Sequence, residues 1–324
     1  MLELPLIAKS VVSHFQQCVR EDKSLDLYHA AIEALAVQVS MPFSMETSVA
    51  QYVSFNVFTQ FLEGLRKVLP SEVFVCSLLG SAKRAALELD FSNHSAQDFL
   101  ALFPFEQWSV ESSSQSLKLS FRVSNSSLNG IEAELFLIVY SHTYFKTQQT
   151  DIDKPIRYDL VSVSASALSE LRIQTETPQY IGQNETCISY HPIDRDCSIK
   201  AVSTATTSTF KVTQALLPYI GRVDVDLVSF GQINRMGKRT VQRALSEEGA
   251  TFRTIKETLS FEFAKRVMTE QDYSISDIAL HLGYADASQF IRAFKRSNGI
   301  TPLQWKKNKK SAGDDINVYR VFTG

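Results

Sequence analysis

The stretch that decides the fold is Ser274–Lys307, with the sequence SISDIALHLGYADASQFIRAFKRSNGITPLQWKK. It contains two helical patterns that meet at Gly283, which permits a left-handed turn that a side chain would resist. Ser274 or Ser276 can cap the first helix. This order of elements predicts a helix-turn-helix, a unit that places its second helix in the major groove of duplex DNA. The buried side of the first helix is expected at Ile275, Ile278, Ala279 and Leu282.

The second helix of this stretch has a basic exposed face. Asp286 or Ser288 opens the helix, and Phe290 and Phe294 recur four positions apart, so both phenylalanines are expected in the core. Small residues at the start of the helix suit insertion into a groove, and the Arg and Lys residues beyond them suit contact with phosphates. The residues left for the exposed face are Ala287, Ser288, Gln289, Arg292, Lys295 and Arg296.

A second unit of this kind is predicted upstream, within Asp224–Leu259. Val241 and Leu245 mark the buried side of its recognition helix, because they lie four positions apart. The other side offers Arg and Gln side chains, which can form paired hydrogen bonds with guanine and adenine edges. A helix from Phe252 to Thr269 is expected to join the two units. The residues predicted to contact DNA from this unit are Lys238, Arg239, Thr240, Gln242 and Arg243.

Four short motifs stand at fixed spacing within the 34 positions of the opening stretch. They are Ile278-Ala279, Gly283-Tyr284, Ser288-Gln289-Phe290-Ile291-Arg292-Ala293-Phe294-Lys295 and Gly299-Ile300-Thr301-Pro302. In these motifs the chain resembles the second helix-turn-helix of the AraC/XylS family of bacterial transcription regulators. The resemblance implies an all-α C-terminal domain with two helix-turn-helix units joined by a long helix. In the first unit Gly231 stands where the family prefers Ala, and Arg235 occupies the place of the usual turn glycine.

These features predict a sequence-specific transcription factor whose two recognition helices enter successive major-groove segments of promoter or operator DNA, about 10 bp apart. Phosphate contacts supply most of the affinity in such complexes, and contacts with base edges supply the choice of sequence. The competing interpretation is a protein-binding module or antiactivator that keeps the fold without binding an operator. The Arg and Gln residues on both recognition faces argue against it. We assign phosphate contact to Lys238, Lys295 and Lys306, and base contact to Arg239, Gln242, Arg243 and Arg292.

Charge is divided unevenly along the chain. The net charge is only −2 over 324 residues, but residues 220–310 contain 16 Lys and Arg against 10 Asp and Glu, whereas the remainder contains 17 against 25. A basic part joined to an acidic part is expected where only the basic part approaches a polyanion. The polar segment STATTST, residues 203–209, is the expected linker. We therefore predict an effector-sensing or dimerisation domain at 1–202, a DNA-binding domain at 210–310 and a tail at 311–324.

The N-terminal part predicts an α+β domain. Its apolar spacing and segment lengths favour helices in the first third, and length favours a helix over a strand for Leu128–Phe145. The other expected helices are Leu4–Val19, Leu25–Val39 and Ser48–Leu69, and the expected strands are Glu72–Leu79, Leu117–Val123, Ile156–Val163, Cys187–Tyr190 and Ser198–Ala201.

Part of this region, Ile131–Val202, resembles the sensor domain of those AraC regulators that lack the arabinose-binding barrel. The shared pattern is a long helix, Pro155, a strand, Thr177-Pro178 and a closing pair of strands. In such regulators the domain senses a small effector or supports self-association. A small-molecule effector, a second copy of the chain and RNA polymerase are thus candidate partners besides DNA, and the resemblance identifies no ligand-binding residue.

No pattern for catalysis, for a cofactor or for a metal is present. The four cysteines form no C-x-x-C pair and have no histidine at ligand spacing, so a structural zinc site is not expected. Cys187 and Cys197 could face each other across a hairpin, but a reduced pair is expected. The six histidines are scattered, and His142 is expected to be structural rather than a ligand contact. We therefore do not expect an enzyme.

Apolar runs in the sequence are short. No run reaches the length of about 18 residues that spans a bilayer. The first 15 residues have Glu3 and Pro5 at their start and Lys9 within the apolar run, so they do not fit a signal peptide. We therefore expect no membrane association and a cytoplasmic location.

Overall fold

The computed structural model describes the chain except residues 1, 43–49, 89–98, 100, 104–106, 123–130, 149–153, 162–176, 193–198, 201–205, 222–224, 271–272 and 313–324. The chain divides into two compact units. The N-terminal unit comprises Glu3–Thr206 together with Ile233–Arg235. The C-terminal unit comprises Met1–Leu2, Thr207–Gln232 and Met236–Gly324.

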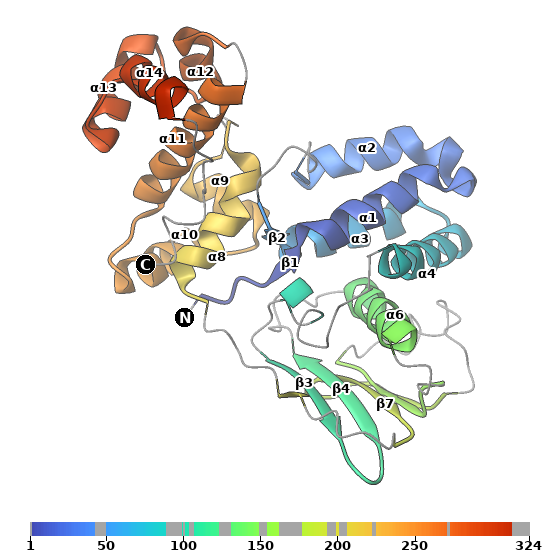
Figure 1. Ribbon diagram of the computed structural model, residues 1–324. Coiled ribbons are helices and arrows are strands. Elements are labelled where there is room, and N and C mark those ends of the chain that lie inside the picture. Colours follow the sequence, from blue (N-terminus) through green and yellow to red (C-terminus); the bar gives the residue numbers. More distant parts are fainter. Residues whose placement is uncertain are drawn as a thin grey trace. The chain divides into compact units, whose positions relative to one another are not determined.

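Helices form one part of the N-terminal unit (Figure 1). Strands β1 (Leu6–Ala8) and β2 (Tyr52–Ser54) pair antiparallel and each leads directly into a helix. Gly64, on helix α3 (Phe55–Val68), leaves room for the side chain of Leu35, which a Cβ atom at residue 64 would meet. The helices of this part are α1 (Lys9–Glu21), η1 (Lys23–Tyr28), α2 (His29–Gln38), α3 (Phe55–Val68), α4 (Ser71–Leu87) and α6 (Ile131–Gln148).

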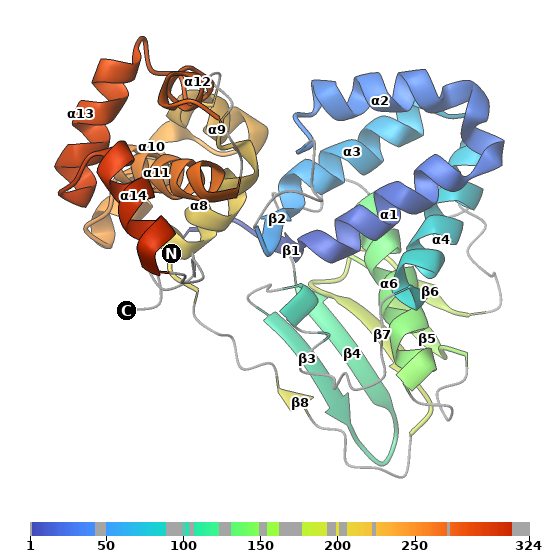
Figure 2. The same ribbon diagram turned by 45° about the horizontal axis from the view of Figure 1, so that its top comes forward.

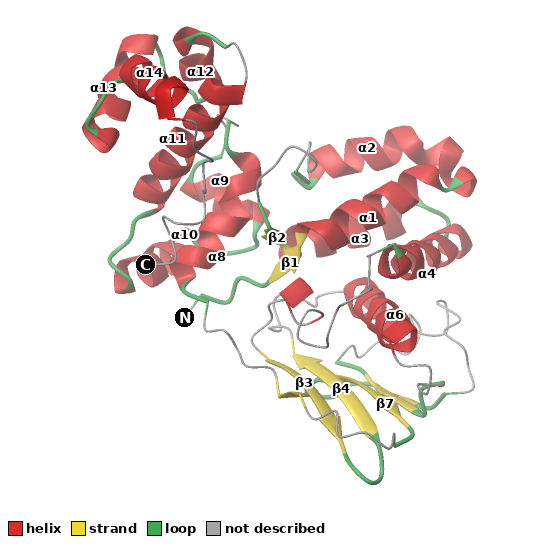
Figure 3. Ribbon diagram, viewed as in Figure 1, coloured by secondary structure: helices red, strands yellow, loops and turns green. Residues whose placement is uncertain are grey.

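A six-stranded sheet forms the other part of this unit (Figure 3). Its strand order is β6-β5-β7-β4-β3-β8, and every neighbouring pair is antiparallel except β5 with β6. Helix α6 lies across one face of the sheet (Figure 2). The strands are β3 (Gln107–Ser112), β4 (Leu117–Arg122), β5 (Arg157–Asp159), β6 (Gln179–Tyr180), β7 (Thr186–Tyr190) and β8 (Ile199–Lys200).

An aromatic cluster at the centre of the N-terminal unit ties its helices together. Phe15 of α1, Phe58 of α3 and Phe136 of α6 are fully buried, and their ring centroids lie 4.8 to 5.4 Å apart in edge-to-face arrangements. Such pairs add about 0.5–1.5 kcal/mol each beyond the burial of their surface. The expected α+β architecture of this region is confirmed.

Several expected elements of the N-terminal unit differ in the structure. The strand expected at Glu72–Leu79 is wrong, because this segment lies in α4, whose buried residues Phe74, Leu78 and Ala82 follow helical spacing. The helix expected from Leu4 begins at Lys9, since Leu6–Ala8 pairs with β2 as a strand. The helix expected from Ser48 begins at Phe55 for the same reason. The choice of helix over strand for α6 is confirmed.

All regular secondary structure in the described residues of the C-terminal unit is helical. Leu2 belongs to this unit: its carbonyl oxygen accepts a hydrogen bond from the buried ammonium group of Lys211 at 3.0 Å. Residues 203–205 of the expected linker 203–209 lie outside the described residues. Its last two residues belong instead to a helix, because the Thr207 side chain caps that helix by accepting from the backbone N–H of Phe210. The helices are α8 (Ser208–Leu216), η2 (Leu217–Tyr219), α9 (Leu227–Ile233), α10 (Lys238–Glu247), α11 (Phe252–Glu270), α12 (Ile275–His281), α13 (Ala287–Asn298) and α14 (Pro302–Ala312).

No helix in the described part of the chain has the length and apolar character needed to cross a membrane. The tail proposed at 311–324 begins within α14, which ends at Ala312, and the rest of it lies outside the described residues.

Candidate nucleic-acid interface

The second helix-turn-helix is α12 followed by α13, and local hydrogen bonds fix both helix starts. Ser274 caps α12 and forms a capping box with Asp277, so that each side chain accepts from the backbone N–H of the other residue. The carboxylate of Asp286 caps α13 by accepting from the backbone N–H of Gln289 at 2.7 Å. Gly283 has a φ of 79° and makes the left-handed turn predicted for it.

The core of the second helix-turn-helix packs against one side of α13. Phe290 and Phe294 are completely buried with ring centroids 5.7 Å apart, and Phe294 meets Phe261 of α11 edge to face at 5.5 Å. Ile278 and Ala279 of α12 are buried in the same cluster. Because the two phenylalanines hold one side of α13 against the core, the opposite side faces outward. On that side Ser288, Gln289, Arg292, Lys295 and Arg296 are exposed, and Ala287 is half-buried.

The first helix-turn-helix is α9 followed by α10, and its turn uses a glycine inside α9. A Cβ atom at Gly231 would lie 2.7 Å from the carbonyl oxygen of Met236, and the N–H of Met236 donates to the Gly231 carbonyl at 2.7 Å. The absence of a side chain therefore allows the chain leaving the turn to pass close to α9. Arg235 adopts a left-handed conformation with a φ of 53°, so the turn forms without the usual glycine.

The exposed face of α10 is polar and positively charged. Val241, Ala244 and Leu245 are buried, which leaves the other side of the helix in solvent. Arg243 lies 3.9 Å from Glu247 in a loose pair between two exposed side chains, so its guanidinium is not held in place. The exposed side chains predicted to contact DNA from this helix are Lys238, Arg239, Thr240, Gln242 and Arg243.

The other cations of the two faces are unpaired within the described part of the chain. Lys238 and Arg239 on α10, and Arg292, Lys295 and Arg296 on α13, form no ion pair with another described residue. A cation without an internal carboxylate partner remains available to a phosphate or a base. Lys306, on α14, is half-buried, so only part of its side chain is open to solvent.

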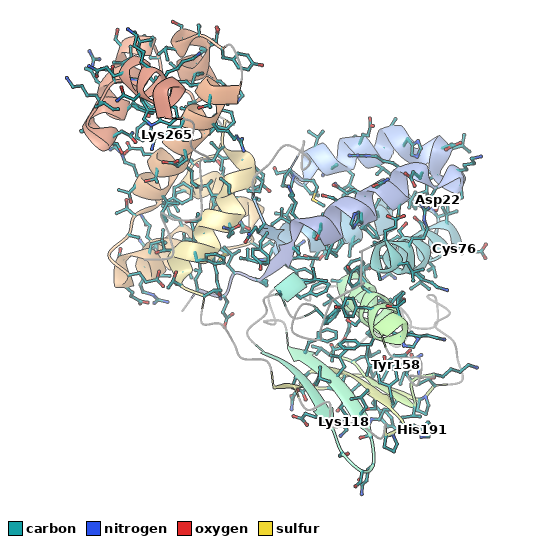
Figure 4. All side chains as sticks on the ribbon, in the orientation of Figure 1. Asp22, Cys76, Lys118, Tyr158, His191 and Lys265 are labelled. Atoms are coloured by element: carbon teal, nitrogen blue, oxygen red, sulfur yellow. The ribbon has the colours of Figure 1, made fainter. Side chains whose placement is uncertain are left out.

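Helix α11 joins the two helix-turn-helix units. Ile255 and Leu259 are buried, and Phe252 packs against Phe230 of α9 in the first helix-turn-helix, with ring centroids 5.2 Å apart. Val267 and Met268 are buried in the core of the second helix-turn-helix. Near the middle of the helix, Lys265 (Figure 4) donates to the carboxylate of Glu262 at 2.7 Å, and both side chains are largely buried.

The remaining residues singled out in the sequence lie in the N-terminal unit. The Nδ1 atom of His142 lies 3.1 Å from the hydroxyl of Tyr190, and burial, followed by the nearby Lys146 and Lys83, lowers the pKa of His142. Cys187 is buried with a free thiol, and Cys197 lies outside the described residues. Within the residues that the structure describes, no three His, Cys, Asp or Glu side chains gather as a metal site would require.

Comparison with known proteins places a family match in the C-terminal part. Residues 232–308 match the family described as a helix-turn-helix domain. The HTH-type transcriptional regulator VqsM of Pseudomonas aeruginosa is 30% identical over 82 residues, which cover 25% of this chain and 25% of that protein. The HTH-type transcriptional activator CfaD of Escherichia coli is 35% identical over 66 residues, which cover 20% of this chain and 25% of CfaD. The match therefore spans about a quarter of each of these relatives.

Among solved structures, one similar chain is the DNA-binding domain of AdpA, a global transcriptional factor, in complex with a target DNA. It is 20% identical, covers 33% of this chain and 96% of that chain, and has a TM-score of 0.29.

Proposed function

We propose that the AraC-type helix-turn-helix domain of this chain binds double-stranded DNA, and that the protein regulates transcription by binding promoter or operator sites. Helices α10 and α13 enter successive major-groove segments, about 10 bp apart. The observation that carries this proposal is that the two helices have the same arrangement of buried and exposed residues. Each is held by a buried apolar side, and each presents unpaired cations with neighbouring Gln, Ser or Thr side chains to solvent.

The two faces contribute differently in this proposal. Arg239, Gln242 and Arg243 offer a long polar surface on α10 that can form bidentate hydrogen bonds with base edges. The start of α13 is small, with Ala287 and Ser288, and only Arg292 has comparable reach. The first unit therefore supplies most of the choice of sequence. Phosphate contacts from Lys238, Lys295 and Lys306 supply most of the affinity.

The N-terminal unit controls the DNA-binding domain in this proposal. Support comes from its acidic composition, which does not suit contact with a polyanion. A small-molecule effector or a second copy of the chain would change its state, and RNA polymerase is the partner that a regulator bound at a promoter meets.

Genome-wide footprinting of the full chain, followed by binding measurements on the sites found, tests the proposal. We expect a shared sequence with two contacted segments about 10 bp apart. Affinity for that sequence is expected to fall with rising salt and to exceed affinity for a scrambled duplex by at least about a thousandfold. Equal affinity for the scrambled duplex at every salt concentration contradicts sequence-specific binding. An absence of binding at low salt contradicts the DNA-binding function as a whole.

A further inference from the structure

The N-terminal unit contains a cavity of about 740 Å³ beside helix α2. Helices α1, α2 and α3 lie side by side in both ribbon views (Figures 1 and 2). The chain turns from α1 into η1 at Asp22 (Figure 4), whose carboxylate accepts from the backbone N–H of Ser24 at 3.0 Å and fixes the turn. The cavity falls within the range of about 300–1,000 Å³ that is usual for small-molecule sites.

The inner wall of the cavity is apolar. Val19 of α1, Ile32 of α2 and Phe61 of α3 line it, together with Met41, and each of the four is at most 7% exposed. These side chains belong to the hydrophobic core of the unit, so the wall is fixed by packing. A wall of this kind favours an apolar body over a sugar or a nucleotide, because it offers no partners for many hydroxyl groups.

Two opposite charges line the same cavity from different helices. Arg20 lies in the last turn of α1, and Glu33 lies in α2. Neither side chain forms an ion pair or hydrogen bond with another described residue. A guanidinium binds a carboxylate with paired hydrogen bonds, and a carboxylate binds an ammonium group. Both residues are exposed to solvent, so a ligand that carries both charges would replace water with a charged partner at each side chain.

A third polar group lines the cavity. The Nε2 atom of His29, at the start of α2, is buried and has no hydrogen-bond partner among the described residues. A buried ring nitrogen without a partner is costly, since it has lost its bond to water. Because this nitrogen has almost no accessible surface, a polar group of a bound ligand can reach it only if the ring turns toward the cavity.

We propose that this cavity binds a zwitterionic small molecule with an apolar body, the chemistry shared by amino acids with large apolar side chains and by their short peptides. Arg20 holds the carboxylate, Glu33 holds the ammonium group, and the apolar body lies against Ile32, Met41 and Phe61. Binding itself does not depend on DNA. The role of the ligand as an effector rests on the proposed function.

Calorimetric titration of the full chain without DNA tests the charge assignment. The probes are L-phenylalanine, the dipeptide L-phenylalanyl-L-phenylalanine, 3-phenylpropionate, which lacks the amino group, and 2-phenylethylamine, which lacks the carboxylate. Arg20→Gln is expected to weaken binding of the two zwitterions and of 3-phenylpropionate about tenfold, and to leave 2-phenylethylamine unchanged. Glu33→Gln is expected to weaken the two zwitterions and 2-phenylethylamine instead. Preference for the amino acid over the dipeptide, or the reverse, decides which of the two sources fits.

Lys23→Gln is the matched control, because Lys23 is an exposed cation of η1 that does not line the cavity. It should leave every affinity unchanged. An equal loss for all four probes in Arg20→Gln, or no binding of either zwitterion at millimolar concentration, overturns the proposal. The proposal is also overturned if no probe binds and the wild-type chain forms a dimer that Arg20→Gln dissociates. The surface would then bind a second copy of the chain. If the probes bind as expected but the chain does not bind DNA, only the proposed function is contradicted.

Discussion

Glu248, the residue after α10, binds the first turn of α8 through the backbone of Ser208. One carboxylate oxygen accepts from the N–H of Ser208 at 2.6 Å, and the other accepts from the N–H of Thr209 at 2.8 Å. The first N–H groups of a helix have no partner within the helix, and a negative charge there is stabilised by the helix dipole. The contact therefore fixes the end of the first recognition helix to the start of the domain.

Replacing Glu248 with Ala should lower the free energy of unfolding of the C-terminal unit by about 0.5–2 kcal/mol, the usual cost of removing a helix cap. Thermal unfolding of the full chain followed by circular dichroism measures this loss. Glu247→Ala is the control, because Glu247 is exposed and its contact with Arg243 is a loose one. An equal effect of the two substitutions would contradict the capping role.

The same contact should make stability depend on pH. Burial alone would raise the pKa of Glu248, but the hydrogen bonds from Thr209 and Ser208 outweigh burial, so the pKa lies below its ordinary value of 4.5. The ionised carboxylate thus stabilises the folded protein fully at pH values above its ordinary pKa. This stabilisation is lost as the pH falls through the lower pKa of the folded protein. The difference in unfolding temperature between wild type and Glu248→Ala should shrink over this acidic range. A difference that stays constant down to pH 3 would contradict the assignment.

Gly231 should not tolerate a side chain. Its Cβ atom would lie 2.7 Å from the Met236 carbonyl oxygen, which is backbone and cannot turn away as a side chain does. Gly231→Ala is therefore expected to destabilise the first helix-turn-helix by about 1–3 kcal/mol, the usual cost of overpacking. Thermal unfolding is again the measurement. Gly80→Ala, in an exposed part of α4 with open space around it, is the control and should be neutral or stabilising by up to about 1 kcal/mol. A stable Gly231→Ala variant would mean that the turn can move.

The C-terminal unit could be predicted from the sequence because its signals are local. Ser274 and Asp286 cap helices only three residues from the groups they bind, and Gly283 makes a turn between neighbouring helices. The resemblance to AraC-type helix-turn-helix proteins is confirmed for this part of the chain. Arg235 shows the limit of such motifs, since a residue other than glycine adopts the left-handed conformation there.

The N-terminal unit was less predictable because distant residues decide it. The pairing of Leu6 with Ser54 makes strands of two segments that look helical alone, and neither segment shows the pairing. In α4, Val73 and Val75 favour a strand locally, but burial of Phe74 and Leu78 on one side of a helix prevails. One contact of the C-terminal unit was also not predicted for this reason: the partners of Glu248 lie about 40 residues earlier in the chain. The role of this unit and the individual DNA contacts stay predictions.

Arg243 should carry sequence recognition. Its side chain is exposed on α10 and only loosely paired with Glu247, so a base edge can take it without breaking a strong contact. Arg243→Ala should cost about 1–3 kcal/mol of binding free energy at the operator and much less on random DNA, and it should relax the choice of one base. Fluorescence anisotropy with matched and scrambled duplexes measures both. Arg253→Ala is the control, an exposed arginine of α11 outside both recognition helices. Equal losses on the two duplexes would assign Arg243 to a phosphate.

Lys306 should contribute affinity without sequence preference. It lies on α14, outside both recognition helices, and it is half-buried. A long side chain of this kind can bury its stem and keep its ammonium group in solvent for a phosphate. Lys306→Ala is expected to weaken binding to all duplexes alike and to reduce the slope of log affinity against log salt by about one, because one fewer counterion is released. Lys306→Arg keeps the charge and should keep the slope. Because truncation also removes packing, the unfolding temperature of each variant must be compared with that of wild type. A changed base preference in Lys306→Ala, or an unchanged slope in a variant that remains folded, would contradict the phosphate contact.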